Sequence, residues 1–377
     1  MIELEIDFLH VGDGERSGDA IAFRYGRDGV YTVHIVDGGT VDSGNNLVTH
    51  IRQFYGNPRR IDHIVLTHAD DDHSSGLRAI IEGFEIGAIW MNRPWLYAVE
   101  IIHLFRDSRF TVDGLAHRLR SDFPILADIE DMAVERRIPI YEAFQGARIG
   151  VFTVLSPARQ RYLAMIPQFS RTPAPAQQVA GLASLIPRPA TAITGGLGGL
   201  GLLSRATEAV RAGVEWIVES WGRETLSEDV ETSASNESSV VQFANIDGRK
   251  ILLTGDAGVV SLHEAADYAI QRGAGIPGLW FMQVPHHGSR RNVSTSVLNR
   301  WLGPPVLQGQ TRDTTAFVSA AKGSDTHPRL KVVNAFIRRG AGVHVTKGVN
   351  KCQYLNLPIR EGWTASVPLD FSDRVES

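Results

Sequence analysis

The sequence predicts a mixed α/β fold in which helices lie outside packed β-sheets. Short runs of branched apolar residues, beginning with IELEIDFLHVG at 2–12, are typical of strands. Groups of such strands alternate along the chain with segments of helical spacing, as in proteins built from mixed layers. The 43% hydrophobic and 21% charged content suits a globular chain with a sizeable core. The 377 residues fit one large domain or two ordinary ones, and we expect a single domain over 1–377.

The first half of the chain contains most of the expected strand and helix pattern. Turn-like GRDG at 26–29 separates two strands, and Ser74 or Ser75 is expected to cap a helix. Residues 138–157 read as two strands joined at Gly146. The expected strands are 2–12, 19–25, 31–39, 61–68 and 86–92, and the expected helices are 44–56, 74–84 and 95–137.

Residues 159–235 differ in composition, being rich in Ala, Pro and Gly. We interpret them as an insertion within the domain, part loop and part helix. It is expected to act as a docking arm for a protein partner or as a lid over the site. The alternative is a tolerated surface insertion.

Regular elements resume after the insertion. NIDGRK at 245–250 contains an Asp-Gly hairpin motif between two strands. The remaining expected strands are 279–288, 315–321, 342–347 and 352–357, and the expected helices are 259–272 and 327–340.

Composition also limits the classes of function. No run of about 18 apolar residues exists, so we expect no membrane span. The N-terminal stretch does not read as a secretory signal, and Cys352 is the single cysteine, so we expect a cytoplasmic protein. The net charge of −4 confines any nucleic-acid binding to local patches.

The segment HADDDH at 68–73 places two histidines and three aspartates directly after an expected buried strand. Imidazole nitrogens and carboxylate oxygens are good ligands for zinc, manganese or iron. On one short turn, His68, Asp70, Asp72 and His73 can converge on one point or on two adjacent points. A solvated acidic turn that caps the next helix would explain one or two aspartates, but not the flanking histidines. We therefore expect metal binding.

Three later segments also carry candidate polar groups, two of them at strand ends. LLTGDAG supplies Asp256, and FMQVPHHGS supplies His286 and His287, although Gly-Asp alone is an ordinary turn. His327 precedes a proline at a helix start, where a histidine is more often a helix-end residue. Asp37, in IVDGG, either orients a ligand histidine or forms the turn.

Taken in order, these motifs resemble the metallo-β-lactamase fold superfamily. The resemblance rests on VGDG, DAIAF, IVDGG, LTHADDDHSSGL, NESSVV, LLTGDA, VPHHGS and HP, and is closest to the hydrolase domain of the ComEC competence proteins and their soluble relatives. The family motif is usually His-x-His-x-Asp-His, and Asp70 stands here at the second histidine position, as in the ComEC-type variant. The similarity covers residues 1 to about 157 and 236 to about 357. It implies a four-layer αββα sandwich with metals at one edge.

The resemblance also implies a set of metal ligands: His68, Asp70, Asp72, His73, Asp256 and His286. His68 and Asp70 would hold one metal, Asp72 and His73 the second, and Asp256 would bridge them. Many members supply another histidine before the Gly-Asp element, whereas this chain has SNESSVV, so Asn236, Glu237 or water takes that place. We expect two divalent ions, zinc or manganese, since an oxygen-rich site tolerates manganese.

Two metals about 3.5–4 Å apart suit displacement at phosphorus or at a carbonyl by a metal-activated hydroxide, which Asp72 would help orient. His287 or His327 would donate a proton to the leaving group or bind a phosphate. Asn236, Ser289, Arg290 and Arg291 are the candidate substrate contacts, because guanidinium groups match phosphate oxygens. The alternative for the two arginines is a solvated face.

The leading hypothesis is a phosphodiesterase or nuclease acting on nucleic acid or a smaller phosphodiester. A hydrolase of a carboxylic ester, thioester or lactam is the second hypothesis. The third is a non-catalytic, metal-stabilised component of a larger assembly.

Overall fold

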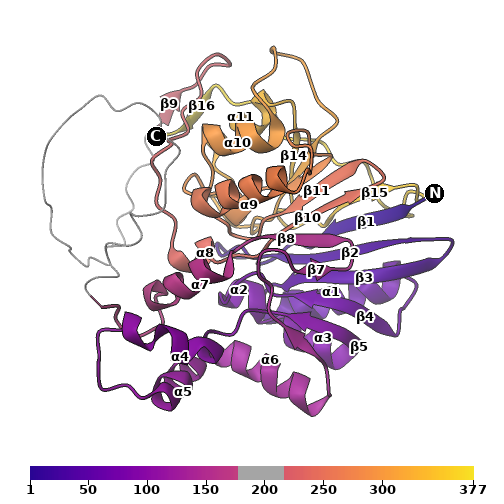
Figure 1. Cartoon of the computed structure of the whole chain (residues 1–377). Helices are drawn as coiled ribbons and strands as arrows, with labels where there is room; N and C mark the ends of the chain where they lie inside the picture. Colours follow the sequence, from indigo (N-terminus) through magenta and orange to yellow (C-terminus); the bar gives the residue numbers. More distant parts are fainter. Residues whose placement is uncertain (177–215) are drawn as a thin grey trace, which may run out of the picture.

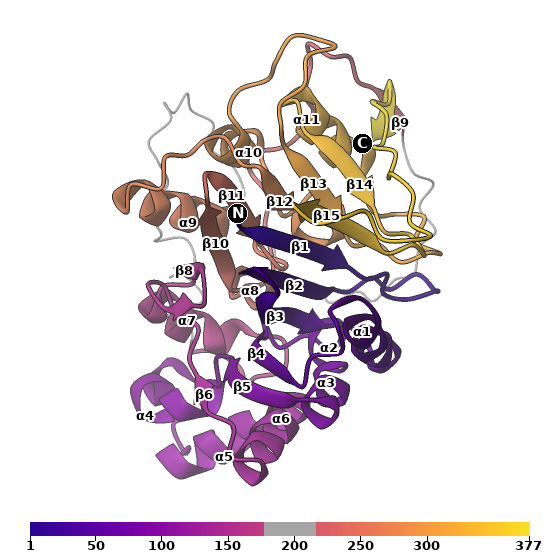
Figure 2. The same ribbon diagram turned by 90° about the vertical axis from the view of Figure 1, so that its right-hand side faces the viewer.

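Two seven-stranded sheets face each other and carry helices on their outer surfaces (Figure 1). The structure is a computed structural model that describes residues 1–176 and 216–377. Figure 2 shows the sheets from the side, with helices α1, α3, α5 and α6 against one and α9, α10 and α11 against the other. The expected four-layer αββα sandwich is confirmed.

The first sheet has the strand order β15-β1-β2-β3-β4-β5-β6. Its strands from β3 to β6 run parallel, so the ends of β3 and β4 meet at one edge. The bounds are β1 Glu3–Phe8, β2 Ala20–Arg27, β3 Val30–Gly38, β4 Arg60–Val65, β5 Glu85–Trp90, β6 Ile140–Tyr141 and β15 Lys351–Leu355.

The second sheet has the order β14-β13-β12-β11-β10-β8-β7. Strands β11 to β14 are parallel, and β10 and β11 form the expected Asp-Gly hairpin. The bounds are β7 Arg148–Ile149, β8 Phe152–Ser156, β10 Val241–Ile246, β11 Arg249–Leu253, β12 Phe281–Gln283, β13 Thr315–Val318 and β14 Gly342–Val345.

Three apolar clusters hold the layers together. The central one lies between the sheets, where Phe8 packs against Phe281 and Phe317 with ring centroids 5.7 and 5.5 Å away. The outer two lie under the helices of each face. The helices are α1 Val41–Phe54, α3 Leu77–Gly83, α5 Val112–Asp122 and α6 Pro124–Glu135 on one face, and α9 Val259–Gln271, α10 Thr295–Leu302 and α11 Leu330–Arg338 on the other.

Two local expectations are wrong. The helix expected at 74–84 is two helices, α2 (Asp71–Ser74) and α3, so neither Ser74 nor Ser75 caps it and Asp70 is the first cap residue. The 148–156 hairpin turns at Gly150, whose φ of 57° suits a tight turn, and not at Gly146. The stretch 95–137 is largely helical, as expected, and is divided into several consecutive helices.

The break between α2 and α3 has a packing cause. A Cβ on Gly76 would lie 2.0 Å from the Gly38 carbonyl oxygen, and one on Gly44 would lie 2.2 Å from the Gly76 oxygen. Glycine at these positions therefore lets β3, α1 and the α2–α3 junction touch through their backbones. This contact places the HADDDH turn against the end of β3.

The expected insertion at 159–235 lies partly outside the described residues, namely over 177–215. Its described parts include α7 (Arg159–Met165), β9 (Trp216–Val218), which pairs with β16 (Arg374–Glu376), and α8 (Ala234–Glu237). Its role as a docking arm or lid stays a prediction. None of the helices in the described ranges has the length and apolarity needed to cross a membrane.

A buried ion pair anchors the segment after β15 to β1. Arg360 Nη1 and Nη2 donate to the two carboxylate oxygens of Asp7 at 2.6 and 2.7 Å, and Asp7 is fully buried. Burial by itself would raise the pKa of Asp7, but hydrogen bonds from His50 and Arg360 lower that pKa well below its usual range.

We predict that Arg360→Met lowers the free energy of unfolding by about 3–5 kcal/mol, because the Asp7 charge stays buried without its main partner. Urea denaturation measures the change. Since the folded pKa of Asp7 is depressed, the stabilisation is present above about pH 4 and is lost as the pH falls.

The matched control is Arg27→Met, which removes an ion pair of 3.7 Å between side chains that are 59% and 54% exposed. Its expected effect is below about 1 kcal/mol. Equal losses in the two variants would show that the Asp7 pair does not anchor the segment.

Candidate metal centre

The polar ends of four strands meet at one edge of the sandwich. Asp37 is at the end of β3, and His68 and His73 follow β4. Asp256 follows β11, and His286 and His287 follow β12. Parallel strands bring their carboxyl ends together, and this edge is where side chains from loops can combine into a site.

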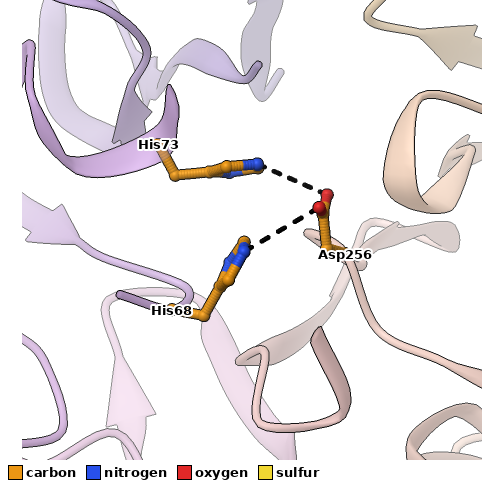
Figure 3. Close-up of side chains that lie close together, drawn as sticks. All are labelled: His68, His73 and Asp256. Atoms are coloured by element: carbon orange, nitrogen blue, oxygen red, sulfur yellow. Dashed lines mark ion pairs between the residues drawn. The ribbon is translucent and has the colours of Figure 1, made fainter. Parts of the chain in front are cut away.

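Asp256 lies between the two histidines of the HADDDH turn. His73 Nε2 lies 3.4 Å from one carboxylate oxygen, Oδ1, and His68 Nε2 lies 3.8 Å from the other, Oδ2. Figure 3 shows both imidazoles pointing toward this carboxylate. All three residues are buried. The carboxylate therefore faces two imidazoles that come from the other sheet.

Asp37 orients the first two histidines. Its Oδ2 accepts hydrogen bonds from His73 Nδ1 at 2.7 Å and from the Thr67 hydroxyl at 2.6 Å. Because the Thr67 hydroxyl proton is used in this way, Thr67 Oγ1 accepts a hydrogen bond from His68 Nδ1 at 3.0 Å. In their neutral forms both imidazoles then direct the Nε2 lone pair at the centre, as metal-binding histidines do.

His287 is held in the same way from the second sheet. Its Nδ1 donates to the Ser319 carbonyl at 3.0 Å, and its Nε2 lies 3.9 Å from Asp256 Oδ1. His286 and His287 both have left-handed backbone conformations, with φ of 47° and 56°. Such conformations are costly for residues other than glycine and are often found at functional sites.

Four buried polar atoms of this cluster have no hydrogen-bond partner within the described ranges. The four atoms are His68 Nε2, His73 Nε2, His287 Nε2 and Asp256 Oδ1. Buried polar atoms are nearly always paired, so four unpaired atoms facing one another indicate a missing partner. Three nitrogen lone pairs and one carboxylate oxygen suit a divalent transition-metal ion.

The charge of the cluster fits a cation as well. Burial opposes protonation of His73, but Asp256 and Asp37 together raise the pKa of His73 well above its usual value. The neighbouring carboxylates thus stabilise positive charge at this point of the protein. The donor groups within 4.8 Å of one another are His68–His73–Asp256, Asp72–His73–His287, Asp19–Asp37–His73 and Asp19–Asp256–His287.

The two aspartates of the turn lie on the exposed side of the cluster. Asp70 Oδ2 is 3.6 Å from His68 Nε2, and Asp70 Oδ1 accepts a hydrogen bond from Ser235 of α8 at 2.7 Å. Asp72 belongs to the group with His73 and His287, and burial raises the pKa of Asp72. Both carboxylates can therefore reach a bound ion.

His286 is more exposed than His287 and is hydrogen-bonded. Its Nδ1 donates to Asn292 at 2.8 Å, and Asn236 Nδ2 lies 3.1 Å from the same nitrogen. Its Nε2 is 3.5 Å from Asp256 Oδ2. The sequence favours His286 as the ligand, whereas the geometry brings His287 into two of the compact donor groups.

The remaining predicted residues lie around this centre. The His327 ring is 6.4 Å from that of His286, and burial lowers the His327 pKa to about 4. Ser289 is buried, and Arg290 and Arg291 are further along the same loop. Asn236 is on α8 beside His286.

Sequence reasoning missed Asp19. This residue is 1% exposed, accepts a hydrogen bond from Gln283 Nε2 at 2.8 Å, and falls within two of the donor groups. Burial raises the pKa of Asp19 to about 7. In the sequence, the signal that could have identified Asp19 was its position: an acidic residue directly before the apolar strand AIAF.

An αββα sandwich with a histidine–aspartate cluster at its edge defines a class of metalloprotein. Residues 14–141, which include the HADDDH turn, match the metallo-beta-lactamase superfamily. The match covers the first part of the chain, and the αββα architecture of the described residues agrees with it. The closer likeness to ComEC-type proteins stays a prediction.

No curated protein matches the sequence. Among solved structures, the hydrolase AbOPH of the beta-lactamase superfamily is 12% identical with a TM-score of 0.29, over 67% of this chain and 70% of that one. CmlA, a diiron beta-hydroxylase from Streptomyces venezuelae, is 11% identical with a TM-score of 0.37, over 94% of this chain and 54% of that one. At these scores neither similarity supports a conclusion about activity.

We predict that Asp37→Asn weakens metal binding about 10–100-fold, because the amide no longer fixes His73 and Thr67 as the carboxylate does. Zinc titration against a competing chelator measures the affinity. Asp113→Asn, at an exposed site on α5, is the control and should bind zinc as the parent does. If Asp37→Asn binds zinc with unchanged affinity, Asp37 does not orient His73 and Thr67 for metal binding.

A second prediction separates the adjacent histidines. His287→Ala should reduce the metal content per chain, measured by atomic emission, more than His286→Ala does, because the buried His287 Nε2 has no other partner. The opposite order would make His286 the stronger ligand.

Proposed function

We propose that the chain is a metal-dependent phosphodiesterase or nuclease. The observation that supports the metal-dependent chemistry most directly is the convergence of the unpaired His68, His73 and His287 nitrogens on the Asp256 carboxylate. The choice of a phosphodiester rests on Arg290 and Arg291, four and five residues after His286. Guanidinium groups bind phosphate oxygens in a paired geometry.

His68 with Asp70, and Asp72 with His73 and His287, are the residues that would hold two ions, with Asp256 between them. Zinc or manganese suits this mixed nitrogen and oxygen donor set. When bound, such ions lower the pKa of water and neutralise charge that develops on phosphoryl oxygens.

The chain's own groups then position the reactants. Asp72, on the exposed side of the cluster, accepts a hydrogen bond from the attacking water and orients it. Burial lowers the pKa of His327 to about 4, so this imidazole beside His286 is neutral near pH 7 and is placed to donate a hydrogen bond to a substrate phosphate oxygen, while the Nδ1 proton of His287 is already donated to Ser319. Asn236 and Ser289 are the nearest candidates to contact the substrate.

Two further expectations stay proposals. The single cysteine supports a reducing compartment, and we propose the cytoplasm. A protein partner that binds the 159–235 stretch also remains untested.

The activity is tested with bis-p-nitrophenyl phosphate in the presence of Mn²⁺ or Zn²⁺. We expect hydrolysis by the metal-loaded chain, and a loss of at least about 100-fold in Asp72→Ala, because the water is no longer oriented. His117→Ala, an exposed change on α5, should retain the parent rate.

Full metal occupancy without hydrolysis would contradict the proposal and favour a binding component. Activity on p-nitrophenyl acetate in place of the phosphodiester would favour the ester hydrolase. Linear DNA, circular DNA and cyclic dinucleotides compared side by side then separate the substrate classes, and the net charge of −4 favours the small ones.

A further inference from the structure

A cavity of about 490 Å³ is lined by three cationic side chains. Arg290 and Arg291 come from the loop after His287, and Lys331 comes from the first turn of α11. The opposite wall is formed by residues of the segment 225–231. None of these lining residues holds the proposed ions.

Lys331 is the unusual group in this cavity. Its side chain is 6% exposed, and within 1–176 and 216–377 its ammonium has no hydrogen-bond or ion-pair partner. Lysine is almost never buried without a partner, because removing its charge from water is costly. Burial, and then the nearby charge of Arg290, lower the pKa of Lys331.

The two arginines add further positive charge to the lining of the cavity. Arg290 donates a hydrogen bond to the Ser377 backbone oxygen, and the Arg291 guanidinium forms no ion pair with another described residue. Asp229 and Glu231 also line the cavity, but both are exposed, where water and salt screen their charges. The Lys331 side chain is therefore largely buried and lines the cavity, with the carboxylates of Glu219 and Glu376 as the nearby opposite charges.

The walls of the cavity are fixed by buried ion pairs. Arg338 donates to Glu219 at 2.6 Å, and Arg339 donates to Glu224 at 2.7 Å. These contacts fasten the segment leading to 225–231 onto α11, which carries Lys331. The site is thus formed before any ligand arrives, and preorganisation favours binding.

Two chain segments connect the cavity to the metal centre. Arg290 is three residues after His287, so their Cα atoms are at most about 11 Å apart. On the other side, the Thr232 hydroxyl donates to the Arg291 carbonyl at 2.7 Å, and α8, whose Ser235 contacts Asp70, begins two residues later. A molecule bound at the centre can extend into the cavity.

We propose that this cavity is an anion site that takes a phosphate group between Lys331, Arg290 and Arg291. A phosphate supplies the missing partner of Lys331 and several acceptors for the arginines. Its assignment to a second phosphate of the substrate rests on the proposed function, whereas the binding of the anion itself does not.

The test is calorimetric titration of inorganic phosphate into the metal-loaded full chain. We expect Lys331→Gln to weaken binding at this site about tenfold or more, since hydrogen bonds to charged groups contribute that much. Lys322→Gln, at an exposed lysine outside the cavity, is the matched control and should bind as the parent does. Asp72→Ala should retain this binding event, which separates it from phosphate bound at the centre.

Equal phosphate binding in Lys331→Gln and the parent, with both chains folded by circular dichroism, would overturn the anion site. Hydrolysis of pdTpdT and dTpdT then identifies the source of the phosphate. A KM that rises in Lys331→Gln for pdTpdT only assigns the cavity to a substrate phosphate, and unchanged KM values with lost phosphate binding assign it to a free anion. A chain that binds phosphate through Lys331 but hydrolyses neither dinucleotide supports the anion site and contradicts only the proposed function.

Discussion

The carboxylate of Asp37 links the fold of the first sheet to the chemistry of its edge. One oxygen accepts from both His73 and Thr67, and the other accepts from the Thr67 backbone N–H. This arrangement aligns the end of β3 with the end of β4 and directs two imidazoles inward at the same time. It depends on a left-handed backbone at Asp37, with φ of 57°, which the close packing of Gly38 and Gly76 helps to maintain.

The same edge contains several buried polar atoms without a hydrogen-bond partner in the described structure. Unpaired ligand nitrogens, crowded carboxylates and left-handed histidines all raise the free energy of the metal-free protein. The apolar layers on either side of the two sheets, and buried pairs such as Asp7–Arg360, offset that cost elsewhere. A site with these features gains stability when a cation binds, because binding to the folded state alone shifts the unfolding equilibrium.

Sequence patterns predicted the elements whose signals are local. Alternating strands, the Asp-Gly hairpin and the long helical spacings agree with the structure, and the metallo-β-lactamase resemblance gave the layer order. The helix start at 74 and the turn at Gly146 were wrong because other parts of the fold decide them. The α2–α3 break follows from contacts with Gly38 and Gly44, which lie more than thirty residues away in the chain.

The sequence by itself determined the class of fold and the types of donor group, since strand ends with His and Asp can be read from neighbouring residues. Only the tertiary structure brought Asp19 into the cluster, directed the His287 Nε2 at Asp256, and left Lys331 facing a cavity. These features depend on side-chain direction and on the burial of groups far apart in the chain. Neither quantity is encoded in the spacing of residues along one segment.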